Sequence, residues 1–129
     1  MANSVGLHEP VEWLNSDVID RHRAIASLQE ELEAVDWYDQ RVAATDDESL
    51  AEILAHNRDE EKEHAAMTLE WLRRRDAKFD EVLRTYLFTE LPIVEVEHEA
   101  EAEGAGGGAG AGARAGDGSL GIGSLREVR

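Results

Sequence analysis

Apolar side chains recur at helical spacing along the first ninety residues, which predicts a chain built from long amphipathic helices. The first long helix is expected over residues 17–42, with Ser16 as its N-terminal cap. Its apolar residues form two rows at heptad spacing: Val18, Ile25 and Leu32 in one, and Leu28, Val35 and Val42 in the other. Pro10 predicts a short helical turn before this helix, over residues 10–15.

The chain is expected to reverse direction at residues 44–47, which read Ala-Thr-Asp-Asp. Thr45 followed three residues later by Glu48 is a capping-box pattern, so a second long helix is expected from this turn to Arg75. The two helices would then run antiparallel as a hairpin.

A shorter third helix is expected from its cap, Asp76, to Thr89, because Pro92 cannot continue a helix. The predicted fold is therefore all-α: an antiparallel two-helix hairpin plus a short C-terminal helix. Two helices about 40 Å long cannot bury their apolar rows against a single neighbour. A second copy of the chain is expected to cover them, so the hairpins would dimerise into a four-helix bundle.

Composition changes near residue 92 and divides the chain into three parts. Residues 1–92 contain all three Trp, both Tyr and both Phe, and are expected to form the helical domain. Residues 93–116 are acidic and then rich in Gly and Ala, which predicts a flexible linker because such a segment buries too little surface to fold. Residues 117–129 again carry large apolar side chains: Leu120, Ile122 and Leu125.

The charge and cysteine content limit the possible partners and ligands. Acidic residues number 29 against 13 basic ones, so the formal net charge is −16 and nucleic acids and anionic membranes are not expected partners. No secretory signal pattern and no membrane-length apolar run are found, so a soluble, intracellular protein is expected. Because cysteine is absent, carboxylates and the five histidines are the only strong metal ligands.

The core-facing seam of the second helix carries charged residues in its middle. At alternating spacings of four and three residues, the seam contains Leu50, Leu54, Asn57, Glu61, His64, Thr68 and Trp71. The first helix has a matching exception, since Glu31 lies between Leu28 and Val35 on its core-facing side. A buried charge is costly unless it is paired or bound to a metal ion.

Antiparallel folding brings these charged groups together. Glu31 lies fifteen residues before Asp46 and Glu61 lies fifteen residues after it, so the two carboxylates are expected at one height, with His64 close to Glu61 on the same face. Di-iron carboxylate bundles use a Glu from each of two helices and a Glu-x-x-His pair from each of the other two. One chain therefore supplies half a site, and two chains supply the ligands for two irons.

Other interpretations of these residues stay open. An isolated Glu-x-x-His in an acidic helix is usually solvated surface, and charges in a seam can serve only to fix pairing register. Glu60, Glu63 and His56 are rival ligands one position round the helix. Tyr38, two turns beyond Glu31, can bind or hydrogen-bond at the site, or can belong to the interface core.

Two further acidic residues lie beside Glu31 on the first helix. Glu30 and Glu33 can line an acidic route for incoming Fe²⁺, with Trp37 packed beside it, or can form an ordinary solvated helix face. No role is assigned from the sequence to the remaining histidines: His8, His22, His56 and His98.

Two long stretches closely resemble the encapsulated ferritins. They are residues 30–41, EELEAVDWYDQR, and residues 56–67, HNRDEEKEHAAM, and the likeness extends over roughly residues 8–92. The resemblance implies that the helical domain is a half-ferritin whose dimer is a ferritin-like four-helix bundle. It implies a ferroxidase that oxidises Fe²⁺ to Fe³⁺, with O₂ as the expected acceptor, at a centre of two irons per dimer.

The resemblance also implies roles for individual residues. The metal ligands would be Glu31, Glu61 and His64, with Tyr38 as a further catalytic residue at the site. Glu30, Glu33 and Trp37 match the position where iron enters in that family, and Ca²⁺ or another divalent cation can be expected there as well. The implied assembly is a ring-shaped decamer of five dimers.

The end of the chain resembles the targeting peptide that docks cargo inside encapsulin shells. This stretch, residues 117–126, reads DGSLGIGSLR. Leu120, Ile122 and Leu125 can fill apolar pockets of the shell protein, while the glycines let the backbone lie close to its wall. The implied location is the cytoplasm, inside an encapsulin nanocompartment whose shell stores the iron mineral.

Two other functions fit the same residues. One is a non-enzymatic helical adaptor or metal-buffering cargo, and the other is a di-iron protein that consumes peroxide rather than O₂. Manganese or zinc can occupy the same ligands as iron, so the residues do not fix the metal.

Overall fold

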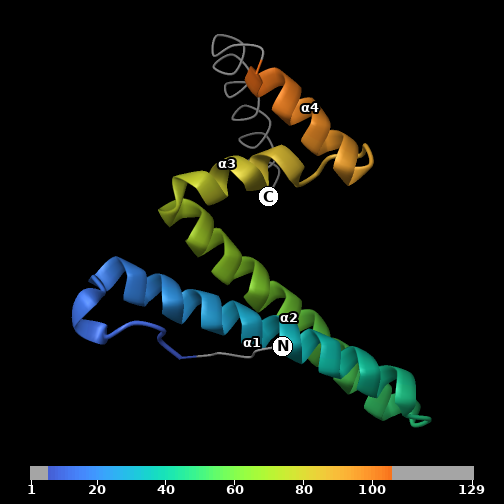
Figure 1. The fold of residues 1–129 in the computed structure, drawn as a ribbon. Helices are drawn as coiled ribbons and strands as arrows, with labels where there is room; N and C mark the ends of the chain where they lie inside the picture. The colour runs from blue at the N-terminus through green and yellow to red at the C-terminus, as the bar shows by residue number, and fades with distance from the viewer. Residues whose placement is uncertain (1–5, 106–129) are drawn as a thin grey trace, which may run out of the picture. The chain divides into compact units, whose positions relative to one another are not determined.

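The computed structural model describes residues 6–105, and every regular element within that range is helical. Figure 1 shows the elements in chain order: a 3-10 turn, η1 (Val11–Trp13), and the α-helices α1 (Ser16–Ala44), α2 (Glu48–Arg75), α3 (Ala77–Tyr86) and α4 (Ile93–Ala105). The predictions of an all-α fold and of a helical turn after Pro10 are confirmed. The Gly/Ala tract beyond residue 105 and the C-terminal peptide lie outside the described residues.

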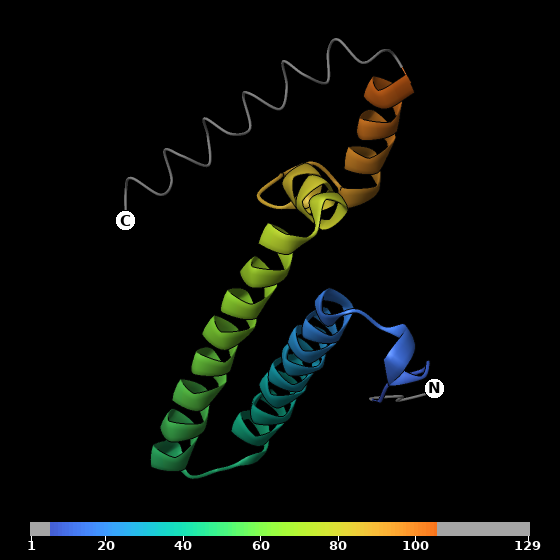
Figure 2. The same ribbon diagram turned by 90° about the vertical axis from the view of Figure 1, so that its left-hand side faces the viewer.

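The helices α1 and α2 run antiparallel as the predicted hairpin, joined by residues 45–47 (Figure 2). Of the described hairpin residues, only Ala65 and Leu72 are buried, and both belong to α2. On α1, Ile25 and Leu32 of the outer apolar row remain 45% and 55% exposed. One chain thus leaves much of its apolar surface uncovered, as the burial argument predicted, and the second copy that would cover it stays a prediction.

The N-terminal caps of both long helices differ from the predicted ones. Asn15, rather than Ser16, caps α1, and its side-chain oxygen accepts a hydrogen bond of 2.9 Å from the backbone N–H three residues on. Asp47, rather than Thr45, caps α2 in the same way at 3.0 Å. The Thr45 hydroxyl instead accepts a hydrogen bond from the Asp47 N–H within the turn. Asp is a stronger capping residue than Thr, which favours Asp47 over Thr45, whereas Asn and Ser cap about equally well.

The third helix is shorter than predicted. It ends at Tyr86 rather than at Thr89, and Phe88 adopts a left-handed backbone conformation with φ of 62°. A left-handed residue shortly after the last helical turn is a common way for a helix to end.

A fourth helix, α4, occupies part of the segment predicted as a linker, and the expectation that no helix forms there was wrong. The carbonyl of Pro92 accepts hydrogen bonds from the backbone N–H groups of Glu95 and Val96, so the proline marks the start of α4. The segment is rich in Glu and Ala, which have high helix propensity. Its acidic composition was therefore compatible with helix as well as with solvated coil.

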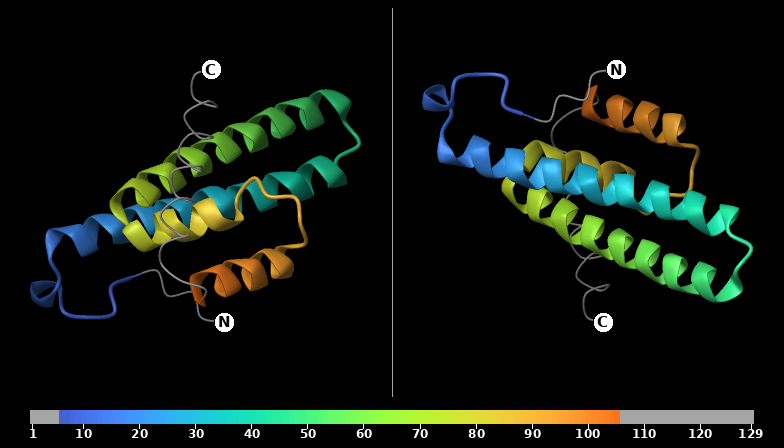
Figure 3. Two further views of the ribbon diagram at one scale, coloured as in Figure 1. Left: turned by 90° about the horizontal axis from the view of Figure 1, so that it is seen from above. Right: turned by 90° about the horizontal axis from the view of Figure 1, so that it is seen from below.

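The chain divides into two compact units after Asp76. One contains the α1–α2 hairpin, and in the other α3 and α4 contact each other across the loop of residues 87–92 (Figure 3), with Val96 buried. None of the helices described has the length and apolarity that crossing a membrane requires.

The cap assignment at α1 is testable with single substitutions. Asn15→Ala should lower the free energy of unfolding by about 1 kcal/mol, because it leaves a backbone N–H of the first turn without its acceptor. Ser16→Ala is the matched control and should change the free energy of unfolding by no more than about a few tenths of a kcal/mol. Chemical denaturation followed by circular dichroism measures both, and the reverse ranking would restore Ser16 as the cap.

Candidate metal centre

Three potential metal ligands meet on one side of the hairpin: Glu31 from α1, and Glu61 and His64 from α2. One ligand atom of each lies within 4.8 Å of the other two. These are the residues that the sequence placed together by counting outward from the turn. Within residues 6–105, no other group of three His, Cys, Asp or Glu side chains meets this condition.

The histidine of this trio contacts both carboxylates. His64 Nδ1 lies 3.1 Å from Glu61 Oε1 and 3.7 Å from Glu31 Oε1. The first contact is local, over three residues of α2, whereas the second joins the two helices. Carboxylate oxygens and imidazole nitrogen are the donor types used by iron, manganese and zinc sites, so the trio fits such a cation chemically.

The trio lies at the surface of the single chain. The side chains of Glu31 and Glu61 are 27% and 24% exposed, and that of His64 is 47% exposed. Three protein ligands that are open on one side cannot fill the coordination shell of a metal ion. A cation at this position would need further ligands from water or from a second copy of the chain.

The two carboxyl groups and the imidazole share protons in the metal-free protein. A hydrogen bond to Glu61, with some burial, raises the pKa of Glu31, while that same hydrogen bond and the one to His64 lower the pKa of Glu61. The hydrogen bond to Glu61 also raises the pKa of His64. Both raised pKa values extend the pH range in which Glu31 and His64 hold protons, so a cation at the trio competes with protons at these two groups.

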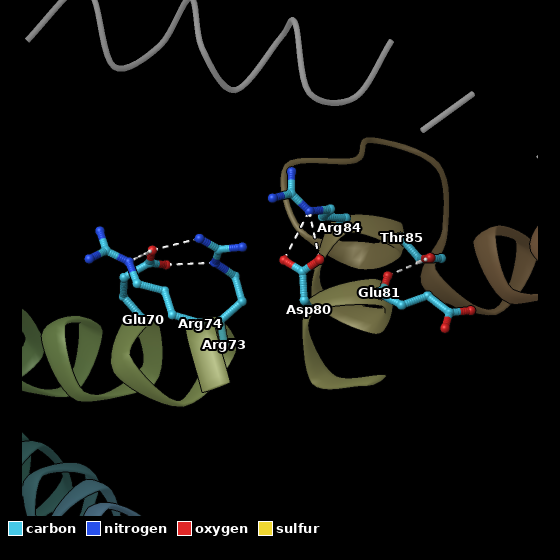
Figure 4. A network of polar contacts seen from close by, with 7 residues as sticks. All are labelled: Glu70, Arg73, Arg74, Asp80, Glu81, Arg84 and Thr85. Carbon is cyan, nitrogen blue, oxygen red and sulfur yellow. Dashed lines mark hydrogen bonds and ion pairs between the residues drawn. The ribbon is translucent and has the colours of Figure 1, made fainter. Parts of the chain in front are cut away.

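Several acidic residues of the described helices are paired with an arginine. Figure 4 shows Glu70 of α2 between Arg73 and Arg74, and the hydrogen bond from Arg73 is the main reason why the pKa of Glu70 falls to about 2. In α3, Figure 4 shows Asp80 in the same role for Arg84. By contrast, Glu31 and Glu61 have no Lys or Arg partner in the part of the chain described, so they are available to a cation.

The rival ligands of the sequence analysis do not converge between the helices. His56 Nε2 lies 3.3 Å from Glu60 Oε2, but this exposed pair is contained within α2. Glu63 is exposed and joins no group of three ligands. A pair on one helix offers fewer donors than the trio, which gains Glu31 from the neighbouring helix.

The other predicted site residues lie near the trio along α1 without joining it. Tyr38 is half-buried, makes no hydrogen bond to the three ligands in the described structure, and has the Arg41 guanidinium 5.3 Å from its ring centroid. Glu30, Glu33 and Trp37 are exposed, and the negative charge of Glu30 helps to raise the pKa of Glu31. Their roles stay predictions.

A groove that the sequence did not predict continues from the trio along the hairpin. It is lined by Asp20, Arg23, Ala24, Ser27, Met67, Thr68 and Trp71. Ser27 lies one turn before Glu31, and Thr68 lies one turn after His64, so the groove and the trio share one side of the hairpin. Met67 is 58% exposed there. The sequence did offer a sign of this apolar surface, because Met67 lies one helical turn before the seam residue Trp71.

Known proteins resemble this chain over most of its length. Residues 6–90 match the sequence model of the family described as EncFtn-like. An encapsulated ferritin-like protein of Rhodospirillum rubrum is 66% identical over 126 residues, which cover 96% of this chain and 90% of that protein. The encapsulin nanocompartment cargo protein EncC of Myxococcus xanthus is 42% identical over 50 residues, 39% of this chain and 38% of that one. Among solved structures, the crystal structure of protein ne0167 from Nitrosomonas europaea has a TM-score of 0.66 and 62% identity, and the match covers 68% of this chain and 97% of that chain.

Cation binding at the trio should depend on pH. Because the hydrogen bond with Glu61 raises the pKa of His64 above its ordinary value of about 6.5, the imidazole holds a proton at pH 6 that a cation must displace, so binding should weaken as pH falls from above 7 toward 6. Calorimetric Co²⁺ titration in buffers of different ionisation enthalpy should show proton release near pH 6, including about one proton from His64.

Two histidine variants locate this proton release. His64→Gln should remove about one of the released protons and weaken binding, while His56→Gln, on the same helix but outside the trio, should change neither. Binding that is independent of pH, or that depends on His56 instead, would contradict the proton sharing described here.

Proposed function

The chain belongs to the EncFtn-like family, and we propose that it is a ferroxidase that oxidises Fe²⁺ to Fe³⁺ at a di-iron centre formed between two copies of the chain. The observation that carries the proposal is the trio of Glu31, Glu61 and His64, whose ligand atoms lie within 4.8 Å of one another, with no Lys or Arg paired to the two acids in the described residues. The ferritin-like names of the relatives support iron as the metal.

Two copies are proposed because one chain supplies half of the ligands. Dinuclear sites in four-helix bundles use four carboxylates and two imidazoles, and one trio provides two carboxylates and one imidazole. The exposed sides of the ligands and the adjoining groove with Met67 and Trp71 offer a surface that a second copy can cover. A ring-shaped decamer of five such dimers is the assembly that we propose.

The chemical role of the trio follows from its donor atoms. Carboxylates are hard ligands that stabilise Fe³⁺ relative to Fe²⁺, so they favour loss of an electron from each bound ferrous ion. Two ferrous ions held together supply the two electrons that convert O₂ and two protons into H₂O₂. We assign Tyr38 to the same site, and Glu30, Glu33 and Trp37 to the route by which Fe²⁺ arrives, where Ca²⁺ or another divalent cation can compete.

Encapsulation is proposed from the relatives and from the tail. The Rhodospirillum rubrum relative is named an encapsulated protein and the Myxococcus xanthus relative an encapsulin nanocompartment cargo protein. We propose that residues 117–129 dock this chain to a shell protein through Leu120, Ile122 and Leu125, which lie outside the described residues. The product Fe³⁺ would then be stored by the shell, inside a cytoplasmic nanocompartment.

The ferroxidase proposal is tested by removing single ligands. Glu31→Gln and His64→Ala should each lower Fe²⁺-dependent oxygen consumption by more than about ten-fold, because even indirect partners of a metal ligand are worth that much. Glu63→Gln and His56→Gln change the same residue types on α2 outside the trio and should leave the rate unchanged. Oligomeric state is measured in parallel by native mass spectrometry.

The alternatives predict different results. If the ligand variants keep the rate and lose only assembly, the chain is a helical adaptor whose seam charges set pairing. If the wild-type protein turns over faster with H₂O₂ than with O₂, it is a peroxide-consuming di-iron protein instead.

The docking proposal has its own test in cells that produce a cognate shell protein. Combined Leu120→Ala, Ile122→Ala and Leu125→Ala substitutions should abolish co-purification with shells and leave oxygen consumption by the free protein unchanged. Glu127→Ala with Val128→Ala is the matched change in the same tail and should keep co-purification. Retention of the triple variant in shells would refute docking through these three side chains.

A further inference from the structure

We propose that the ion pair between Arg58 and Asp39 is a positioning contact, which holds α1 and α2 at the register where Glu31 meets Glu61 after the short turn of residues 45–47 has brought the helices to about that height. Arg58 Nη1 donates a hydrogen bond of 2.9 Å to Asp39 Oδ1, across 19 residues of sequence and from one helix to the other. The inference rests on the proposed metal centre only for its functional consequence, since the register itself is a property of the hairpin.

This contact is unusual among the polar contacts of the hairpin. In the described residues, only two ion pairs join α1 to α2: Arg58 with Asp39, and His64 with Glu31. The other ion pairs of these helices connect residues no more than four apart on the same helix. Local pairs leave the relative height of the two helices unconstrained, so the Arg58–Asp39 pair is the one polar register contact outside the trio.

The ion pair lies on the opposite edge of the helix–helix seam from the trio. At about 100° per residue, Asp39 is turned by about 80° from Glu31 on α1, and Arg58 by about 60° from Glu61 on α2. The two rotations have the same sign when each helix is viewed from its own N-terminus. Because the helices are antiparallel, both rotations move away from the trio toward the same edge of the seam. Val35 and the buried Ala65 fall between the two edges. The seam is therefore held by the trio on one edge and by the ion pair on the other.

The geometry of the pair is suited to fixing a height along the helix axis. Arg58 is held by two acids, because its Nε also donates to Asp59 Oδ1 at 3.1 Å, and its side chain is only 23% exposed. Apolar heptad rows attract without direction and tolerate sliding by one turn, which is about 5.4 Å. Such a slide exceeds the 4.8 Å within which the three ligand atoms now lie, so it would separate Glu31 from Glu61.

A first experiment measures register without metal. The chain has no cysteine, so Glu31→Cys with Glu61→Cys introduces a single pair whose intramolecular disulfide forms only when the two positions face each other. Adding Arg58→Ala should slow this disulfide by more than about five-fold, while adding Arg84→Ala should not. Arg84 forms an ion pair of 2.9 Å with Asp80, but within α3. Equal rates in the Arg58→Ala and Arg84→Ala backgrounds would overturn the proposal.

A second experiment measures the consequence for the metal centre. In the otherwise native chain, Arg58→Ala and Asp39→Ala should each weaken Co²⁺ binding by about ten-fold, the effect typical of an indirect partner of a metal ligand, with the helix content unchanged by circular dichroism. The exchanged variant, Arg58→Asp with Asp39→Arg, should recover most of the affinity. A purely structural pair would lower the melting temperature and leave Co²⁺ affinity unchanged, which would also overturn the proposal.

The two experiments separate this inference from the proposed function. If the native chain binds no Co²⁺ but disulfide formation still depends on Arg58, the metal centre fails and the register contact stands. If Co²⁺ binds equally to native and Arg58→Ala chains, the metal centre stands and the positioning role fails.

Discussion

Two carboxyl groups held together between helices, with an imidazole but no Lys or Arg beside them in the described residues, constrain the rest of this structure. Glu31 and Glu61 lie within reach of each other in a chain whose net charge is already −16. The hydrogen bonds with Glu61 raise the pKa values of both Glu31 and His64, so protons compete with any cation for this position. Some other acids of the described helices are paired with arginine, as Glu70 is. The absence of such a partner at the trio, within the described residues, leaves a position that a divalent cation can neutralise better than a proton can.

The single hairpin leaves apolar side chains exposed and the proposed metal site incompletely coordinated, and a second copy of the chain would correct both. The first is burial, because α1 has no buried residue of its own and only Ala65 and Leu72 of α2 are covered. The second is coordination, because three ligands open to solvent do not fill a metal shell. The groove beside the trio puts exposed apolar surface and incomplete coordination on one side of the hairpin. Hydrophobic association and metal binding would then stabilise the same interface and raise each other's apparent affinity.

The trio was predictable from the sequence because, in an antiparallel hairpin, residues that are equally far in sequence from the turn lie side by side. Glu31 and Glu61 are symmetric about Asp46, and no side-chain detail is needed to see it. The caps were less predictable, since Asn15 and Ser16 are neighbours with similar capping strength. The α4 helix was missed because the Gly-rich tract dominated the composition of its segment. The Arg58–Asp39 pair required the orientation of both helices about their axes, which apolar rows define only loosely.

The difference between the trio and its rivals identifies the property on which the proposed chemistry depends. His56 and Glu60 have the same residue types as His64 and Glu61 and also lie within ion-pair distance, yet they remain a pair on one helix. The trio differs from this pair because it includes Glu31 of α1. The distance from Glu31 to Glu61 and His64 depends on how α1 packs against α2 and not on the local sequence of α2. Ligand type alone therefore does not define the site. Any change that slides or separates the helices would alter the proposed metal centre without touching a ligand, so hairpin packing and metal affinity should vary together across substitutions in the seam.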